Sequence, residues 1–426
     1  MTIAAVDLKS LGGRARQAAR QLATLSTRVK NRALHDIADA LLAREEEILA
    51  ANTRDMRGAR EAGLPEKVQD RLMLKHERLE TIAADVRTVA ALPDPVGETF
   101  DMRTLANGLI VGKTSVPLGV LAAIYEARPN VTVDISSLCL KSGNACILRG
   151  GKEAIHSNSV LARIISLVAT DAGVPAGAIQ FIESTERALV GDLLKMKGVI
   201  DVVVPRGSAD LINFVAENAA MPVLIGGTGV CHTYVDKDAD LEMASNIAHN
   251  AKCRRYTICN ALDTLLVHRD VAGAYLPMIG RRWAEAGVEM RCDPASHDIL
   301  SAADVPGLNV RPAREEDFGK EHLAPVATVK VVESLDHAID HIYRYSTGHS
   351  DAIVTEDYSA ARRFVAEVDT AVVYVNASTQ FTDGAQFGLG AEIIDSTQKF
   401  HARGPVGLRE ITTYKWVVMG TGQVRP

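Results

Sequence analysis

The first hundred residues alternate apolar and charged positions with the period of a surface helix. Leu34, Ile37, Leu41, Ile48 and Leu49 recur at helical spacing among Arg, Glu and Asp. This spacing gives a helix one apolar stripe that packs on a core while its other faces stay in water. Gly-Leu-Pro at 63–65 and Pro-Asp-Pro at 93–95 interrupt the pattern. We therefore predict separate helices that end before about residue 95.

From about residue 120 the pattern changes to short apolar runs separated by helix-compatible segments. The runs lie at 120–125, 145–149, 179–182, 199–204 and 222–225. Five such runs alternating with helices predict a parallel sheet with helices on both faces. Such sheets bind ligands beyond the carboxyl ends of their strands, so the residues after each run are candidates for binding.

A second alternating region, from Leu262 to about Val375, predicts a second α/β domain. Its strands are expected at 265–267, 326–332, 352–354 and 371–375. The segment 108–116 alternates with a period near two, and the tail after Phe400 is rich in Gly and Thr. Both are either arms that pair with another subunit or surface segments packed on their own chain, and the pattern alone does not decide.

Composition narrows the classes of function. The 426 residues are 47% hydrophobic and 23% charged, enough for a large core divided among two or three domains. A net charge of −6, no basic stripe and only 4% aromatic residues argue against a nucleic-acid partner. No run of 18 apolar residues and no export-signal pattern occur. We expect no membrane contact and a cytoplasmic protein.

Six cysteines, at 139, 146, 231, 253, 259 and 292, include no Cys-x-x-Cys pair. Zinc-type spacing is thus missing, and a disulfide is not expected in a reducing compartment. Cys253 and Cys259 lie six residues apart, so on one helix they would point in different directions. We predict no metal site, and most of the thiols should be buried and inert.

Cys259 lies at a junction between a helix-like stretch and a strand. Lys252, Arg254 and Arg255 are close in sequence and would lower a thiol pKa if they were also close in space. Context alone still favours an inert thiol over a reactive one.

Two turns are candidates for holding a phosphate. Gly207-Ser208 separates a predicted strand from a helix, and its N–H groups suit an anion, although an ordinary capped turn is favoured on this motif alone. Arg149 and Lys152 flank two glycines after an earlier strand and could grip a ribose phosphate; a solvated strand end is the competing account. The spacing Gly-x-Gly-x-x-Gly does not occur after any strand.

The order of several motifs resembles the aldehyde dehydrogenase superfamily. They are Pro129-Asn130, Ser142-Gly143-Asn144, Gly207-Ser208, Gly226-Gly227, Cys259 and Glu321 to Pro325. Longer stretches resemble the gamma-glutamyl phosphate reductase family within it. These are Tyr125 to Thr132, Cys259-Asn260 with its flanks, Val332 to Ile353, Tyr374 to Ser378, and Phe387 to Glu392 continuing through His401 to Pro405. The similarity runs over nearly the whole chain.

The resemblance implies an α/β fold of the aldehyde dehydrogenase type in three parts. A parallel-sheet cofactor domain is expected over 1–106 and 119–228, and an α/β catalytic domain over 229–395. A small β oligomerisation arm with the tail is expected over 107–118 and 396–426, so the protein should be a homo-oligomer.

The resemblance also implies the reaction: NADPH-dependent reduction of L-glutamate 5-phosphate to L-glutamate 5-semialdehyde with phosphate release, in proline biosynthesis. Cys259 matches the nucleophile that carries the thioacyl group, and Asn130 matches the side-chain oxyanion donor. Glu321 matches the carboxylate that holds the nicotinamide ribose. Gly207 and Ser208 match the turn at the cofactor, and Arg149 falls where many relatives contact the adenosine ribose.

The substrate carries two anionic groups and an ammonium. Candidate partners by residue type are Arg128, Arg254, Arg255, Arg403, Asn376 and Ser378. For each arginine a structural salt bridge is an equal account.

One departure from the superfamily pattern concerns Leu224. Hydrolytic relatives carry a glutamate there that activates water, and a leucine cannot accept a proton. This favours a reductase. The alternatives are an aldehyde dehydrogenase acting on another acyl donor and a catalytically silent scaffold that kept the fold. No kinase-like domain is recognised in the chain, so we expect the acyl phosphate to come from glutamate 5-kinase through a transient encounter.

Overall fold

The computed structural model describes residues 6–425, which form two compact units. Within the described residues, the first unit comprises 6–225 together with 388–394 and 406–425, and the second comprises 226–387 and 395–405. The division at 225/226 lies close to the domain boundary expected at 228/229. The C-terminal region, in contrast, alternates between the two units instead of ending one domain at 395.

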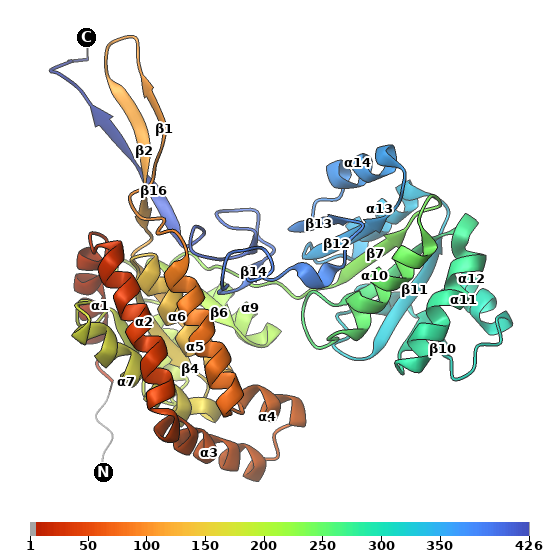
Figure 1. The fold of residues 1–426 in the computed structure, drawn as a ribbon, viewed down its shortest axis with the longest axis horizontal. Coiled ribbons are helices and arrows are strands. Elements are labelled where there is room, and N and C mark those ends of the chain that lie inside the picture. Colours follow the sequence, from red (N-terminus) through yellow and green to blue (C-terminus); the bar gives the residue numbers. More distant parts are fainter. Residues whose placement is uncertain (1–5, 426) are drawn as a thin grey trace. The chain divides into compact units, whose positions relative to one another are not determined.

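The first unit begins with five helices: α1 (Leu8–Leu22), α2 (Thr27–Ala43), α3 (Glu45–Glu61), α4 (Glu66–Leu72) and α5 (His76–Ala91). Of the predicted apolar stripe, Leu34, Ile37, Leu41 and Ile48 are fully buried, whereas Leu49 is only half-buried. α2 packs along α5 and along α7 (Ile155–Asp171), and Figure 1 shows these helices side by side.

A four-stranded parallel sheet follows, in the order β5-β4-β3-β6. Its strands are β3 (Val120–Tyr125), β4 (Ala145–Gly150), β5 (Ile179–Phe181) and β6 (Val202–Arg206), and its helices are α6 (Asn130–Lys141), α7 (Ile155–Asp171), α8 (Ala188–Leu193) and α9 (Ala209–Asn218), with a short 3₁₀ turn at Lys152–Ala154. Four of the five predicted strands are confirmed. The fifth, at 222–225, is wrong: it makes one bridge, between Val203 and Val223, because Pro222 has no N–H to donate.

The first unit also carries a three-stranded antiparallel arm in the order β1-β2-β16. β1 (Thr99–Thr104) and β2 (Ile110–Pro117) form a hairpin, and β16 (Thr412–Met419) pairs with β2. The arm extends beyond the helices of its unit (Figure 1). β1 was not predicted: all six of its residues are exposed, so no buried face produces an apolar pattern in the sequence.

The second unit is built on a seven-stranded parallel sheet in the order β10-β9-β11-β8-β7-β12-β13. The strands are β7 (Cys231–Val235), β8 (Leu262–His268), β9 (Glu289–Cys292), β10 (Asn309–Pro312), β11 (Val326–Val332), β12 (Ser350–Val354) and β13 (Val372–Val375). The helices are α10 (Leu241–Cys253), α11 (Arg269–Glu285), α12 (Pro294–Ala302), α13 (Leu335–Tyr345) and α14 (Tyr358–Glu367), with 3₁₀ turns at Glu315–Asp317 and Thr379–Phe381. Two short strands, β14 (Asp395–Ser396) and β15 (Gly404–Pro405), pair with each other.

Apolar side chains cover both faces of this sheet. In one cluster, Trp283, Tyr275 and Leu276 of α11 pack with strand residues that include Leu265 and Val267 of β8. In a second cluster, Phe364 of α14 packs with Tyr234 and Leu266. Burial on both faces explains why the central strands read as continuous apolar runs. β7, β9 and β10 escaped prediction because they are short and carry Thr, His, Glu or Arg.

Within residues 6–425, no helix has both the length and the apolar character that crossing a membrane requires.

Candidate active site

Four loops of the second unit meet at one edge of its sheet. Gly229 precedes β7, Cys259 precedes β8, Glu321 precedes β11 and His349 precedes β12. Because these strands are parallel, their amino ends lie at the same edge. The site therefore lies at the amino ends of these strands and not beyond their carboxyl ends, where parallel sheets generally bind ligands.

The loop that carries Cys259 is held by backbone hydrogen bonds from distant side chains. The amide of Gln380 donates to the carbonyls of Ala251, at 2.9 Å, and Arg255, at 3.1 Å. Asn260 donates its amide to the carbonyl of Thr382, at 2.8 Å. These contacts fix the segment between α10 and β8, so the direction of the Cys259 side chain is set by the fold.

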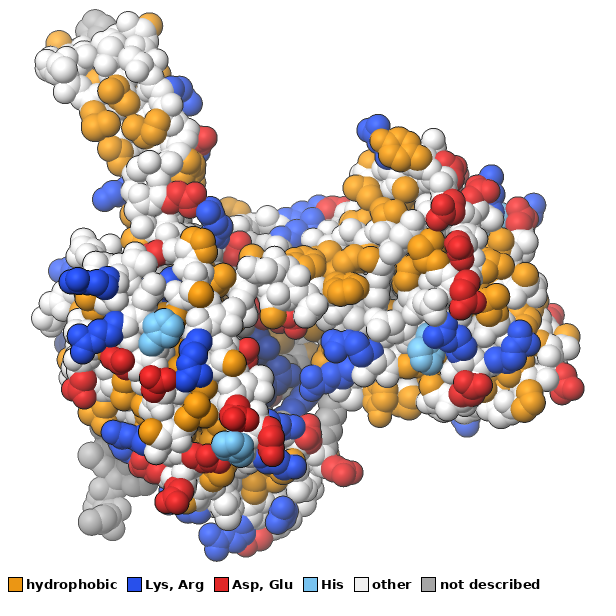
Figure 2. All heavy atoms as spheres, viewed as in Figure 1, with side chains coloured by type: hydrophobic (Ala, Val, Ile, Leu, Met, Phe, Trp, Pro, Cys, Tyr) orange, Lys and Arg blue, Asp and Glu red, His pale blue; other side chains and the backbone are white. Residues whose placement is uncertain are grey.

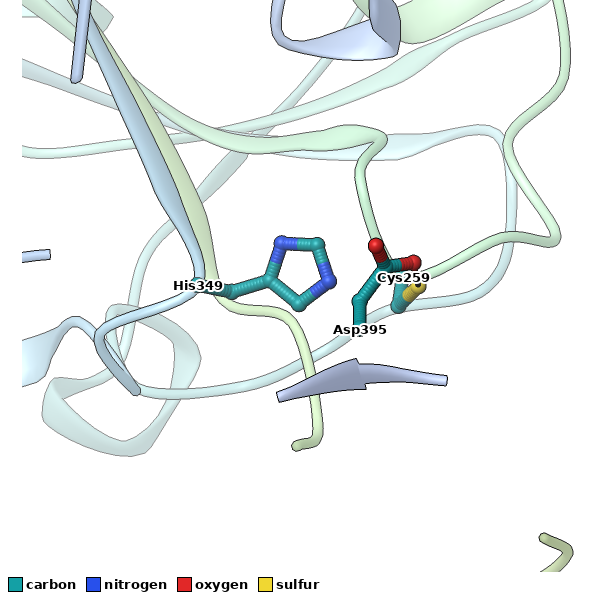
Figure 3. Close-up of side chains that lie close together, drawn as sticks. All are labelled: Cys259, His349 and Asp395. Carbon is teal, nitrogen blue, oxygen red and sulfur yellow. Dashed lines mark hydrogen bonds between the residues drawn. The ribbon is translucent and has the colours of Figure 1, made fainter. Parts of the chain in front are cut away.

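Cys259 lies beside a histidine and an aspartate (Figure 3). Its Sγ is 3.9 Å from Oδ2 of Asp395. One potential ligand atom each from Cys259, His349 and Asp395 lies within 4.8 Å of the others. Asp395 is positioned by the pairing of β14 with β15 and by a 3.2 Å hydrogen bond from the N–H of Gly227 to its carbonyl.

His349 is buried and its orientation is determined by its neighbours. Nδ1 lies 2.8 Å from Oγ of Ser350, which in turn lies 2.6 Å from Oγ1 of Thr382. Figure 3 shows the other ring nitrogen turned toward Cys259 and Asp395. Nε2 is therefore the atom that faces the thiol.

Gly229 allows Glu321 and Cys259 to approach the same backbone. Its N–H donates to Oε1 of Glu321, at 3.1 Å. A Cβ at position 229 would lie 1.6 Å from the carbonyl oxygen of Cys259, so only glycine fits there. Cys231 donates its thiol to the same carbonyl, at 3.2 Å. The structure thus brings together Cys259 and Glu321, two residues that the sequence had singled out separately.

Three other thiols of the second unit are less reactive than an exposed cysteine. Burial raises the pKa of Cys253 to about 11 and that of Cys292 to about 12. Burial also raises the pKa of Cys231 well above its ordinary value. These thiols stay protonated at neutral pH, and a protonated thiol is a poor nucleophile.

The predicted cofactor residues of the first unit follow strands of its sheet. Ser208 is the N-cap of α9, and its N–H donates to Oε2 of Glu126, at 2.8 Å. A Cβ at Gly207 would lie 2.5 Å from the same oxygen. The turn is therefore a helix cap whose Ser208 N–H is bonded to a carboxylate of the same unit. Its expected role at the cofactor stays a prediction.

Arg149 is the penultimate residue of β4 and is half-buried, and burial lowers its pKa. Its Nη2 lies 3.5 Å from the carbonyl of Thr185, while its buried Nε has no hydrogen-bond partner among the described residues. The charges that act on it include Glu153 and a second guanidinium, Arg187. Two arginines with an unused buried donor fit an anionic group such as a nucleotide phosphate.

Asn130 and Leu224 also belong to the first unit. Asn130 opens α6, and its amide donates to Oδ2 of Asp134, at 2.9 Å, whose pKa burial raises to about 7. Leu224 is buried, and its N–H donates to the carbonyl of Val203, at 2.9 Å. The role expected for Asn130 stays a prediction.

Among the predicted substrate residues, Arg254 and Arg255 are exposed on the Cys259 loop, and Nε of Arg254 donates to Gln380. Ser378 is buried and caps the 3₁₀ turn that contains Gln380. Arg128 lies in the first unit, between β3 and α6.

The other two are held elsewhere. Asn376 bonds the N–H and carbonyl of Thr355, both at 2.9 Å, beyond the carboxyl ends of β12 and β13. This places Asn376 at the edge opposite Cys259. Arg403 pairs with Asp369, at 2.7 Å, and Lys399 together with Arg403 lowers the pKa of that carboxyl to about 2. The structure thus gives Asn376 and Arg403 structural partners.

Sequence reasoning did not single out His349 and Asp395 as site residues. His349 stood inside one of the stretches that carried the resemblance, Gly348 to Asp351, and this was the available signal. Asp395 had none, because it is placed by the pairing of two very short strands.

A cysteine held at a strand junction, with a glutamate bound to the glycine that contacts it, fits the family suggested by the motifs. The family model described as the aldehyde dehydrogenase family matches residues 2–297 and 309–417. This chain belongs to the aldehyde dehydrogenase family. The match covers both units, so the predicted fold class is confirmed.

Individual relatives carry a more specific name than the family model does. A gamma-glutamyl phosphate reductase of Dehalococcoides mccartyi is 55% identical over 425 residues, covering 100% of each chain. One from Roseiflexus castenholzii is 54% identical over 98% of this chain and 99% of its own. The crystal structure of gamma-glutamyl phosphate reductase from Thermotoga maritima has a TM-score of 0.95 at 45% identity, covering 99% of this chain and 100% of that one. The resemblance stated from the motifs is confirmed.

Proposed function

We propose that this protein reduces L-glutamate 5-phosphate to L-glutamate 5-semialdehyde with release of phosphate, using NADPH, as a step of proline biosynthesis. The observation that carries the proposal is the likeness over the whole chain to enzymes named for this reaction. The partly exposed thiol of Cys259, beside His349 and Asp395, supports it. The reaction class is acyl transfer to a cysteine followed by reduction.

Cys259 is the proposed nucleophile. Its thiolate attacks the acyl-phosphate carbonyl, the C–O bond to phosphate breaks, and a thioester to Sγ remains. Covalent catalysis of this kind divides one difficult step into two easier ones. The backbone N–H of Cys259 and the amide of Asn130 are the proposed donors to the developing oxyanion, and losing one such donor costs about 10²–10³ in rate.

His349 is suited to take the thiol proton. Its Nδ1 lies 2.8 Å from Oγ of Ser350 and its Nε2 faces Cys259, so Nε2 is the nitrogen positioned to exchange a proton with the thiol. The departing phosphate needs one proton to leave as HPO₄²⁻, and protonated His349 can return the proton it received. The balance is then one proton consumed in each turnover, and the thiolate is regenerated.

The cofactor, when bound, supplies the hydride that converts the thioester to the aldehyde. Glu321 is proposed to hold its nicotinamide ribose, and its carboxylate is fixed by Gly229 beside Cys259. Arg149 is proposed to contact the adenosine ribose phosphate, with Gly207 and Ser208 at the pyrophosphate. Leu224 offers no base to activate water, so the thioester is spared hydrolysis.

The reverse assay tests this proposal. With the semialdehyde, inorganic phosphate and NADP⁺, we expect reduction of the cofactor that depends on phosphate, faster than with NAD⁺. Robust oxidation without phosphate would instead indicate a hydrolytic aldehyde dehydrogenase. Cofactor binding without turnover on any of these combinations would indicate a silent scaffold.

A further inference from the structure

Cys259, His349 and Asp395 present three kinds of metal ligand to one point. A thiol sulfur, an imidazole nitrogen and a carboxylate oxygen lie within 4.8 Å of one another, and the sulfur–oxygen distance is 3.9 Å. Imidazole, thiolate and carboxylate are the ligands that Zn²⁺ takes in proteins. The three residues come from segments 90 and 46 residues apart, which is why cysteine spacing had indicated no metal site.

The separations are close to those of a tetrahedral zinc site. Bonds of about 2.0–2.3 Å place neighbouring ligands of a tetrahedron about 3.3–3.8 Å apart. Since the three ligand atoms lie within 4.8 Å of one another, their separations must contract by up to about 1.5 Å. Cys259 and Asp395 are partly exposed and can rotate toward the metal, whereas His349 is buried.

The surroundings of His349 match those of a metal-binding histidine. Such histidines almost always hold their second ring nitrogen in a hydrogen bond, which fixes the tautomer and the ring. Here Ser350 holds Nδ1, and Thr382 holds Ser350, so Nε2 is presented to the other two ligands (Figure 3). Charge favours a cation as well, because a thiolate and a carboxylate together neutralise Zn²⁺.

We propose that Cys259, His349 and Asp395 form an inhibitory zinc site, in which Zn²⁺ reversibly removes the nucleophile. The thiol proton passes to solvent as the S–Zn bond forms, and nothing is oxidised or reduced. A fourth position stays open to water. The inhibition rests on the proposed function, since it assumes that Cys259 is the nucleophile, but the binding of zinc does not.

Metal binding is measured on the full chain after chelator treatment. Titration with Co²⁺ should show one ion per chain with a thiolate-to-cobalt absorption band in the near ultraviolet, absent in Cys259→Ser. Zn²⁺ affinity is obtained by competition with a chromogenic chelator. His349→Gln and Asp395→Asn should each weaken zinc binding by at least about tenfold. Cys253→Ala, which alters a half-buried thiol six residues away, should leave the affinity unchanged.

A second measurement needs no substitution, and so does not depend on whether the His349 variant folds. Iodoacetamide labelling of the wild type, mapped by mass spectrometry, should be slowed at Cys259 by stoichiometric Zn²⁺ and restored by chelator. Unprotected Cys259, or zinc affinity unaltered in both His349→Gln and Asp395→Asn, overturns the site.

Turnover separates this proposal from the proposed function. An active reductase that Zn²⁺ does not inhibit at saturation contradicts the inhibitory site while the reaction stands. A protein without reductase activity that still binds one zinc through these three residues contradicts the reaction while the metal site stands. Inhibition that L-glutamate 5-phosphate relieves competitively would show that the substrate and the metal share this point.

Discussion

Cys259 and Cys253 are two thiols of one short segment with different environments. Cys253 ends α10 against the apolar core of the second unit, and burial raises its pKa to about 11. Cys259 lies in a loop whose backbone is tied by Gln380 and Asn260, and its sulfur faces Asp395 and His349. At the residue scale, reactivity is decided by what surrounds the sulfur and not by the nearby arginines in the sequence.

Replacing each thiol should therefore give opposite results. Cys259→Ala should lower turnover by at least about 1,000-fold, because no other group forms the thioester, while NADPH binding measured by fluorescence titration is retained. Cys253→Ala should keep most of the activity. Equal losses in the two variants would contradict the assignment of the nucleophile.

At the scale of elements, α13 contributes a histidine that is kept neutral by the fold. His341 is buried among the rings of Phe318, Tyr345 and His232. Burial chiefly, and then the charges of His232 and Lys330, lower its pKa from 6.5 to about 2. The folded protein thus binds a proton at His341 more weakly than the unfolded chain does, and packing of α13 depends on the neutral ring.

Acidification should weaken the fold through this histidine. Its contribution is fully present above pH 6.5 and is lost as the pH falls toward the folded pKa. Between pH 7 and pH 5 the loss is about 2 kcal/mol, and His341→Gln should flatten the pH dependence of the free energy of unfolding by that amount.

The matched control for this prediction is His337→Gln, an exposed histidine of the same helix, which should leave the slope as it is in the wild type. Urea unfolding at pH 7 and at pH 5 gives the free energy of unfolding of each variant and of the wild type. An unaltered slope in His341→Gln would contradict the linkage.

At the scale of the whole molecule, the arm presents an apolar surface that its own unit does not cover. Its exposed side chains include Phe100, Met102, Tyr414, Trp416, Val418 and Met419, and apolar side chains gather on the arm in Figure 2. β1 and β16 are its outer strands, with backbone groups available to a further strand. A second copy of the chain is the occupant we propose, in keeping with the expected homo-oligomer.

A charge on the arm should disrupt that association. Val418→Asp places a carboxylate on β16, where Val418 is 56% exposed, and should shift the protein toward a smaller species in light scattering coupled to size exclusion. Val365→Asp on α14 is the control, since Val365 is 52% exposed in the second unit. If the wild type, Val418→Asp and Val365→Asp all had the same mass, the arm would take no part in assembly.

The sequence by itself determined the parts of the fold that depend on local pattern. The stripe of Leu34, Ile37 and Leu41 and the buried runs at 120–125 and 326–332 each carry a period that any packing of this chain must satisfy. The stretches around Cys259 and Glu321 were among the motifs that indicated the protein family. Short or edge segments such as β1, β9 and 222–225 were missed or wrongly assigned, because their structure depends on partners elsewhere in the chain.

Only the tertiary structure decided which residues surround the nucleophile. Parallel strands bring the starts of β7, β8, β11 and β12 to one edge, so Gly229, Cys259, Glu321 and His349 meet although up to 120 residues separate them. Asp395 arrives through a two-residue strand, and Asn376 is carried to the opposite edge. Cysteine spacing describes one segment only, whereas the three residues of the proposed zinc site are brought together by the pairing of strands.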